Sequence, residues 1–186
     1  LLERMIAEGG EKALADLGLD TGFDVTNPLV AELVRDYSLR LSGAVTDSTV
    51  RSIQRVLEAG ITAGASNQEI ADAIQETGSL DPQRAQAISR TESARAYSRG
   101  QEAGWEQSGV VAGKKWLLAP RACEFCRAAA AELNKRTTPL GEPFYPKGHI
   151  LTGASGGRIA LDYDDTFGPP LHPQCRCSVQ SVLNVS

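Results

Sequence analysis

Residues 81–109 read DPQRAQAISRTESARAYSRGQEAGWEQSG and decide the architecture of the chain, because this stretch can form one long helix. Asp81-Pro82 is a typical helix start, since an Asp side chain caps free backbone N–H groups and proline fits the first helical position. No helix breaker follows until Gly100 and Gly104. The stretch therefore predicts a helix from Pro82 to about Gln107.

The charged side chains of this predicted helix allow two interpretations. Glu92 and Arg95 are three residues apart and can pair on the helix surface. The favoured interpretation is a solvated face, as charged helix faces usually are. The alternative is a polar cluster of Arg90, Glu92 and Arg99 against the next domain. The charged residues of the helix are Arg84, Arg90, Glu92, Arg95, Arg99, Glu102 and Glu106.

Shorter helices are predicted upstream. Ser66 and Glu69 form a capping box, and Gly78 closes the helix that it opens. Gly9-Gly10 is expected to weaken the first helix in its middle. Residues 1–108 contain neither His nor Cys, so we expect packing and protein contact from them rather than catalysis. The predicted helices run from Leu1 to Leu17, from Asn27-Pro28 to Leu41, from Thr46-Asp47 to Ile61, and from Ser66 to Gly78.

The composition changes after Ser108. Residues 1–108 carry ten Lys or Arg and seventeen Asp or Glu, whereas residues 109–186 carry nine and six. All four cysteines and both histidines lie in the second part. Its predicted elements are short strands at Val110-Val111 and Lys115 to Leu118 flanking a glycine turn, a helix from Arg127 to Leu133, a hairpin of Ile150-Leu151 and Arg158 to Leu161, and a final strand from Ser178 to Leu183.

The strongest chemical signal is Cys123-x2-Cys126 followed by His172-x2-Cys175-x-Cys177. A Cys-x2-Cys turn lets two thiolates bind one ion, and His172-x2-Cys175 has the same bite. Cys175 and Cys177 face the same side if that segment is extended. Zinc takes four such sulfur and nitrogen ligands in a tetrahedron. The five residues therefore predict a structural zinc site in which five candidates compete for four positions.

Two other states of the cysteines stay open. Two disulfides, each pairing Cys123 or Cys126 with Cys175 or Cys177, would join the start of this domain to its end in an oxidising compartment. Reduced, buried thiols are the third state. The spacing of the residues does not choose among the three.

The remaining polar residues of this part have simpler interpretations. His149 is expected in a solvent-exposed loop rather than at a metal. A turn accounts for Asp162, Asp164 and Asp165 better than a cation site does. We expect Arg121 and Arg176 to pair with carboxylates. The sequence thus concentrates its chemistry in the Cys and His residues.

Several function classes are disfavoured. A net charge of −4 disfavours a generic nucleic-acid binder. The sequence contains no run of 18 apolar residues, so it predicts no membrane-spanning helix. His-x-Glu upstream of the cysteines and His-Glu-x-x-His are both missing, so we predict no enzyme activity. A zinc-held module that contacts nucleic acid and a toxin-type effector domain are the alternative functions.

The order of these motifs resembles the phage Mu F-like head morphogenesis family of minor capsid proteins. The resemblance covers about residues 50 to 180, and its PPxHPxCRC ending is the most specific piece. The segments that carry it are Arg84-Ala85, Ile88 to Glu92, Gly100, Gly104, Gly109, Lys114 to Trp116, Cys123-x2-Cys126 and Pro169 to Cys177.

The resemblance implies a non-enzymatic structural protein of a tailed-phage head. It would act in head assembly near the portal vertex, in several copies per virion, and would be made in the host cytoplasm. The implied partners are portal, major capsid or scaffold proteins, with incidental contact to packaged DNA. The resulting fold prediction is α+β, with a helical arm at 1–45, the helical part of the head morphogenesis domain at 46–108, and at 109–186 a small domain of short strands held together by its Cys/His cluster.

Overall fold

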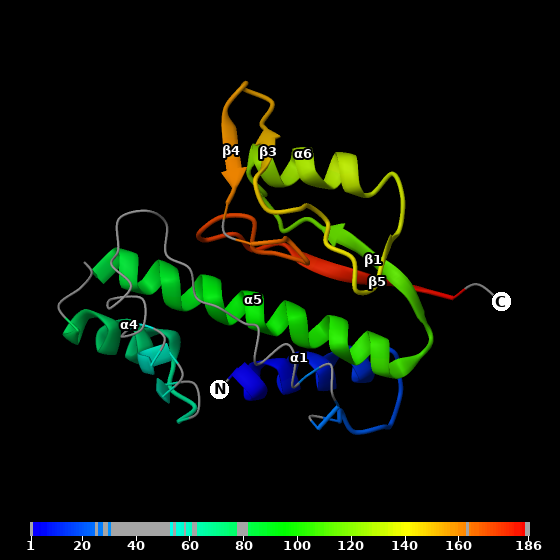
Figure 1. The fold of residues 1–186 in the computed structure, drawn as a ribbon, viewed down its shortest axis with the longest axis horizontal. Helices are drawn as coiled ribbons and strands as arrows, with labels where there is room; N and C mark the ends of the chain where they lie inside the picture. The colour runs from blue at the N-terminus through cyan, green and yellow to red at the C-terminus, as the bar shows by residue number, and fades with distance from the viewer. Residues whose placement is uncertain are drawn as a thin grey trace.

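The chain folds into helices and short strands, which confirms the predicted α+β class (Figure 1). The computed structural model describes residues 2–24, 26–27, 30, 53, 55–57, 59–60, 63–77, 82–162 and 164–184. The helix predicted from Asn27-Pro28, and most of the one predicted from Thr46-Asp47, lie outside these residues. The elements are α1 (Leu2–Asp16), α4 (Asn67–Glu76), α5 (Pro82–Ser108), β1 (Val111–Leu117), α6 (Glu124–Leu133), β2 (Thr138–Pro139), β3 (His149–Thr152), β4 (Arg158–Leu161) and β5 (Ser178–Leu183).

Helix α5 runs through the middle of the fold (Figure 1). Its 27 residues from Pro82 to Ser108 confirm the predicted long helix. Gly109 follows with φ of 66°, a left-handed conformation that glycine adopts readily after a helix. Helices α1 and α4 lie on one side of α5, and the strands and α6 lie on the other (Figure 1). Among the described helices, none combines the length and apolarity that crossing a bilayer requires.

Glycines let α1 and α5 approach backbone to backbone. A Cβ atom on Gly100 would lie 2.5 Å from Ile6 Cα, and one on Gly104 would lie 2.6 Å from Gly10 O. Both distances are too short for any side chain. Gly9-Gly10, expected to weaken the first helix, instead lies within an uninterrupted α1. The helix tolerates the pair because the missing side chain of Gly9 makes room for the backbone of α5 at Tyr97, and that of Gly10 makes room for the Phe23 ring.

Helix α4 begins with the predicted capping box. Glu69 N donates to Ser66 Oγ at 3.2 Å, and Ser66 N donates to Glu69 Oε2 at 2.7 Å. Hydrogen bonds from the backbone and then the side chain of Ser66 hold the pKa of the Glu69 carboxyl below its usual value. The buried side of α4 packs into an apolar cluster of Ile53, Leu57, Ile70, Ala71, Ile74 and Ile88, which joins α4 to α5.

The C-terminal part contains a three-stranded antiparallel sheet in the order β2-β1-β5 and a separate β3-β4 hairpin. The hairpin and the final strand confirm their predictions. The prediction of two strands around a glycine turn is wrong, because β1 is one strand from Val111 to Leu117 with an irregularity between Val111 and Gly113. Gly113 serves pairing rather than turning, since a Cβ there would clash with the Thr138 backbone of β2.

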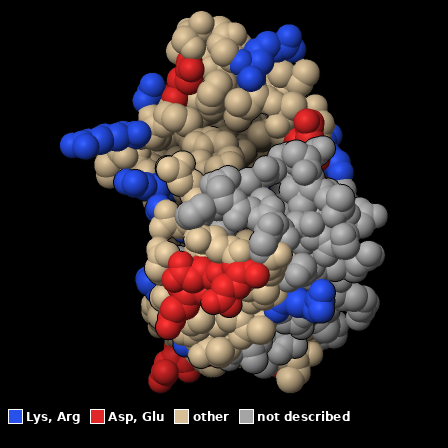
Figure 2. Space-filling model, turned by 90° about the vertical axis from the view of Figure 1, so that its left-hand side faces the viewer, with Lys and Arg blue, Asp and Glu red and all other residues tan. Residues whose placement is uncertain are grey.

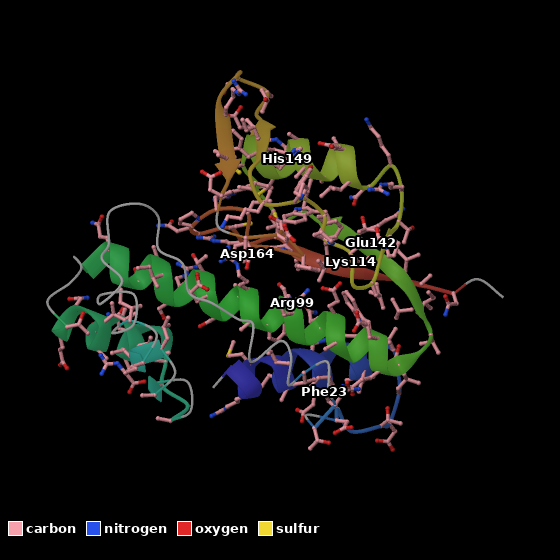
Figure 3. The ribbon with its side chains drawn as sticks, viewed as in Figure 1. Phe23, Arg99, Lys114, Glu142, His149 and Asp164 are labelled. Carbon is pink, nitrogen blue, oxygen red and sulfur yellow. The ribbon has the colours of Figure 1, made fainter. Side chains whose placement is uncertain are left out.

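An ion cluster is buried between α5 and the sheet, where Figure 3 labels Arg99 and Lys114. Lys114 on β1 is 1% exposed and donates to Glu102 Oε1 and, at 2.9 Å, to Phe167 O. Glu102 also accepts from Arg99 Nη1 and from Gly141 N, each at 3.0 Å. Burial lowers the pKa of Lys114, and the Glu102 carboxylate opposes that shift. The cluster therefore attaches β1 to α5 through a buried Lys114 and a buried Glu102.

The buried carboxylates contradict the favoured interpretation of α5 as a solvated face. Glu92 and Glu102 are each 4% exposed. The predicted pair of Glu92 and Arg95 is confirmed, with 3.4 Å between Oε1 and Nη1. The alternative cluster is only partly right, since Arg99 takes part in the buried contacts while Arg90 is exposed. Period and composition could not reveal which charged residues face the next domain.

The surface keeps the charge difference between the two parts of the chain. Figure 2 shows a patch of Asp and Glu on the helical part and several Lys and Arg around the C-terminal part. Helix α4 contributes the exposed Glu69, Asp72 and Glu76, and it contains no Lys or Arg.

Candidate metal centre

Cys123 and Cys126 lie at the first turn of α6. Cys123 is the N-cap residue, and its Sγ accepts a hydrogen bond from Cys126 N at 3.4 Å. The helix begins at Glu124, three residues before the predicted start at Arg127. The cysteine sulfur explains this difference, because it binds a free N–H group of the first turn as a Ser or Asp side chain would. The early start places both thiols on one side of the turn.

A second turn presents His172 and Cys175. Cys175 N donates to His172 O at 3.1 Å, and Gln174 inside the turn has a left-handed φ of 64°. His172 Nδ1 lies 2.9 Å from Pro173 O. Because a carbonyl oxygen only accepts, Nδ1 carries the ring proton and Nε2 keeps a free lone pair. His172 is therefore oriented to bind an ion through Nε2.

The structure brings all five predicted residues to one place, which we call the Cys/His cluster. His172 Nε2 lies 3.1 Å from Cys123 Sγ and 3.3 Å from Cys126 Sγ. Cys126 Sγ lies 3.6 Å from Cys175 Sγ. The ligand atoms of Cys123, Cys126 and His172 lie within 4.8 Å of one another, and so do those of Cys126, Cys175 and Cys177. Cys126 belongs to both triads and is the centre of the cluster.

The separations of 3.1 to 3.6 Å lie near those of a tetrahedral metal site, and the two that involve His172 are shorter by about 0.2 to 0.4 Å. With zinc–sulfur bonds of about 2.3 Å and zinc–nitrogen bonds of about 2.0 Å, neighbouring ligand atoms of a tetrahedron lie roughly 3.5 to 3.8 Å apart. A disulfide needs a sulfur–sulfur distance of about 2.05 Å. All four cysteines are free thiols, so no disulfide forms in this structure. The donor set and its spacing can therefore hold a metal ion.

Hydrogen bonds divide the protons unequally among the thiols. The Cys126 thiol bonds to Cys175 and lowers the pKa of Cys175, with help from the backbone of Cys177 and Leu171. The same contact, together with burial, raises the pKa of Cys126. Burial acts to raise the pKa of Cys123, but hydrogen bonds from Cys126 outweigh it and lower that pKa. Thiolates are thus favoured on both sides of Cys126, and thiolate is the form that binds metal.

Glu124 ties the β3-β4 hairpin to the same turn of α6. Its carboxylate accepts from Ser155 N at 2.7 Å and from Ser155 Oγ at 2.8 Å, and both bonds lower its pKa. A Cβ on Gly153 would lie 2.5 Å from Glu124 Oε2, so any other residue there would displace this carboxylate. The sequence signalled the turn at the hairpin tip but not its contact with Glu124, because the two segments are distant in sequence.

The other polar residues lie outside the cluster. His149 starts β3, half buried, and stacks on Tyr145 with 4.2 Å between ring centroids, so the expected exposed loop is wrong. Asp165 Oδ1 accepts from Lys147 N at 2.8 Å, a loop contact that suits the turn interpretation. Arg121 and Arg176 are both exposed, and the structure records no ion pair of either with a described carboxylate.

Comparison with known proteins completes the description. The family model described as "Phage Mu protein F like protein" matches residues 51–180, a range that includes α4, α5 and the whole Cys/His cluster. The uncharacterized protein YqbB of Bacillus subtilis (strain 168) is 27% identical over 115 residues, which are 62% of this chain and 38% of that protein. The chain thus spans well under half the length of this relative. No solved structure matches the chain. Because the family model covers more than half of the sequence, the chain belongs to the phage Mu F-like protein family.

Proposed function

We propose that this chain is a structural protein of a tailed-phage head that acts in head assembly near the portal vertex and catalyses no reaction. Its partners on this proposal are portal, major capsid or scaffold proteins, and several copies enter each virion. The protein is made in the host cytoplasm and ends in the virion. The division into an arm at 1–45, a helical part at 46–108 and a Cys/His domain at 109–186 belongs to the same proposal.

The family match over residues 51–180 is the observation that carries this proposal. The matched range is built around a long helix, α5, whose contacts within the chain are to α1, α4 and the sheet. The charged residues of α5 support a structural role, since Glu102 and Lys114 attach the sheet to the helix. An assembly protein needs such a rigid frame to present surfaces to its partners.

Quantitative mass spectrometry of purified proheads and virions tests the proposal. We expect peptides of this chain in at least one of the two particles, at a small and constant ratio to the portal protein. Immunogold labelling should place the chain at one vertex. Absence of the chain from both particles overturns the proposal, and even labelling over the whole shell overturns the position near the portal.

We further propose that the Cys/His cluster holds one structural zinc ion through four of its five residues. Cys123, Cys126, His172 and Cys175 form a chain of contacts between 3.1 and 3.6 Å. Cys177 joins only the triad with Cys126 and Cys175, and its backbone bonds to the Cys175 sulfur. Cys177 is therefore the fifth, unused candidate, and the closed site has no open position for catalysis.

Metal analysis and thiol titration of the purified full chain test the zinc site. We expect about one zinc per chain, with loss of structure on chelation. Cys177→Ser should keep the zinc, whereas Cys175→Ser, two residues away, should lose most of it. Equal loss in both variants overturns the choice of ligands. A chain without metal and without free thiols overturns the zinc site in favour of disulfides.

A further inference from the structure

Two thiols of the cluster lie in direct contact across the domain. Cys126 Sγ and Cys175 Sγ are 3.6 Å apart, although the residues are 49 positions apart in the sequence. Cys126 is 2% exposed on α6, and Cys175 lies in the segment that leads into β5. A bond between them would join the same two segments that the proposed zinc would join.

We infer that the cluster has a second, covalent state, in which Cys126 and Cys175 form a disulfide when no metal protects them and an oxidant is present. The two S–H bonds break and one S–S bond forms, so the pair loses two electrons and two protons. A diazene oxidant such as diamide takes up all of them and becomes the hydrazine. The inference rests on the proposed zinc site only for the protection of the thiols.

The contacts select this pair over the neighbouring ones. The sulfurs of Cys126 and Cys175 need to approach by about 1.5 Å to reach the bond length of a disulfide. Cys123 Sγ instead contacts His172 Nε2 at 3.1 Å and accepts from Cys126 N at the start of α6. Pairing Cys123 with Cys126 would remove this cap from the helix. Cys177 is two residues from Cys175, too near in sequence for an unstrained bond.

The covalent state would keep the domain closed where zinc binding fails. Thiols stay reduced in a bacterial cytoplasm and become oxidised outside it. If the proposed function holds, a head protein meets both conditions, first during assembly and then in the released particle. Helix α6 and the segment before β5 would then stay joined in both conditions. The zinc ion would join them in the reducing cytoplasm, and the disulfide would join them in the released particle.

Disulfide mapping of the full chain tests the inference. The chain is freed of metal by a chelator under nitrogen and treated with diamide. Free thiols are then blocked with N-ethylmaleimide, and the digested protein is analysed by mass spectrometry. We expect the peptide pair Cys126–Cys175 as the main product, formed roughly tenfold more slowly when zinc is bound. A main product of Cys123–Cys126, or of bonds between chains, overturns the inference.

Variants separate this result from a failure of the zinc site. With both proteins freed of metal, the double variant Cys123→Ser/Cys177→Ser keeps only the two thiols in contact and should form the bond as fast as the parent. The matched variant Cys126→Ser/Cys175→Ser keeps the other two thiols. It should not form a disulfide within the chain at the rate seen for the parent. A parent that binds no zinc but forms Cys126–Cys175 refutes the metal proposal alone. A parent that binds zinc but, without metal, forms another pair refutes the disulfide alone.

Discussion

The close contact between α1 and α5 predicts that Gly100→Ala destabilises the protein, although alanine favours helices. Gly100 lies in the middle of α5, and a Cβ there would lie 2.5 Å from Ile6 Cα and closer still to Ile6 O. These atoms belong to the backbone of α1, so no rotation of a side chain can relieve the contact. The two helices must instead move apart along the whole seam.

Two opposing terms set the size of the effect. In an exposed helix, replacing glycine by alanine gains about 1 kcal/mol. Forcing an extra carbon into a packed interior costs about 1 to 3 kcal/mol, and backbone contact favours the upper end of that range. We therefore expect a net loss of about 2 kcal/mol, which corresponds to a fall in Tm of roughly 4 to 8 °C for a domain of this size.

Circular dichroism during thermal and urea unfolding measures this loss. Gly10→Ala is the matched control, because it adds the same carbon to α1 but meets the Phe23 ring, a side chain that can move, instead of the backbone of α5. We expect Gly10→Ala to lose less stability than Gly100→Ala. A Gly100→Ala protein at least as stable as the parent refutes the backbone contact and leaves only helix propensity.

Three further predictions concern single contacts. Lys114→Met should lower the free energy of unfolding by about 3 kcal/mol, since it removes the cation from the buried Glu102. In urea unfolding, the double variant Lys114→Met/Glu102→Gln should lose less than the sum of the two single variants. Ser155 lowers the pKa of Glu124, so this carboxylate adds stability above its unfolded pKa of about 4.5 and loses it as the pH falls through the folded value. Glu124→Gln should therefore flatten the loss of Tm below pH 4.5, and an unchanged slope contradicts the contact. Ser66→Ala should cost about 1 kcal/mol in urea unfolding, and no change would mean that the cap contributes nothing.

Local signals explain which elements could be predicted from the sequence. The Ser66 capping box, the Pro82 start and the glycine-rich hairpin tip each act within a few residues, and the structure contains all three elements. The start of α6 was missed because cysteine is not a usual N-cap residue. Each of the two short spacings of the metal-site residues is a turn, which sequence can show, whereas the meeting of the two turns depends on the fold.

Contacts between distant segments could not be predicted in the same way. Lys114 occurs in a basic doublet that suggests a surface, yet it is buried because Glu102, on another element, offers it a carboxylate. Gly9-Gly10 looks unfavourable for a helix, and its use is visible only with α5 and Phe23 beside it. The choice among five ligands also depends on distances across 49 residues. Local rules disfavour a buried Lys114 in a strand and Gly9-Gly10 in a helix, and both are explained by a contact with a distant segment.

The small C-terminal domain has contacts of two kinds, the buried ion cluster and the Cys/His cluster, and the two have different roles. Lys114 attaches β1 to α5, and β1 pairs with β5 along its length. The Cys/His cluster joins α6 to the segment before β5. A cross-link that closes a loop of 49 residues contributes about 4 kcal/mol by its effect on the unfolded chain. That amount is comparable with the stability of many domains, whereas the ion cluster mainly fixes position, because burying charges offsets much of their attraction. With the proposed zinc or disulfide in place, the cluster would therefore determine whether the small domain stays folded, and the ion pair would determine where on α5 it stands.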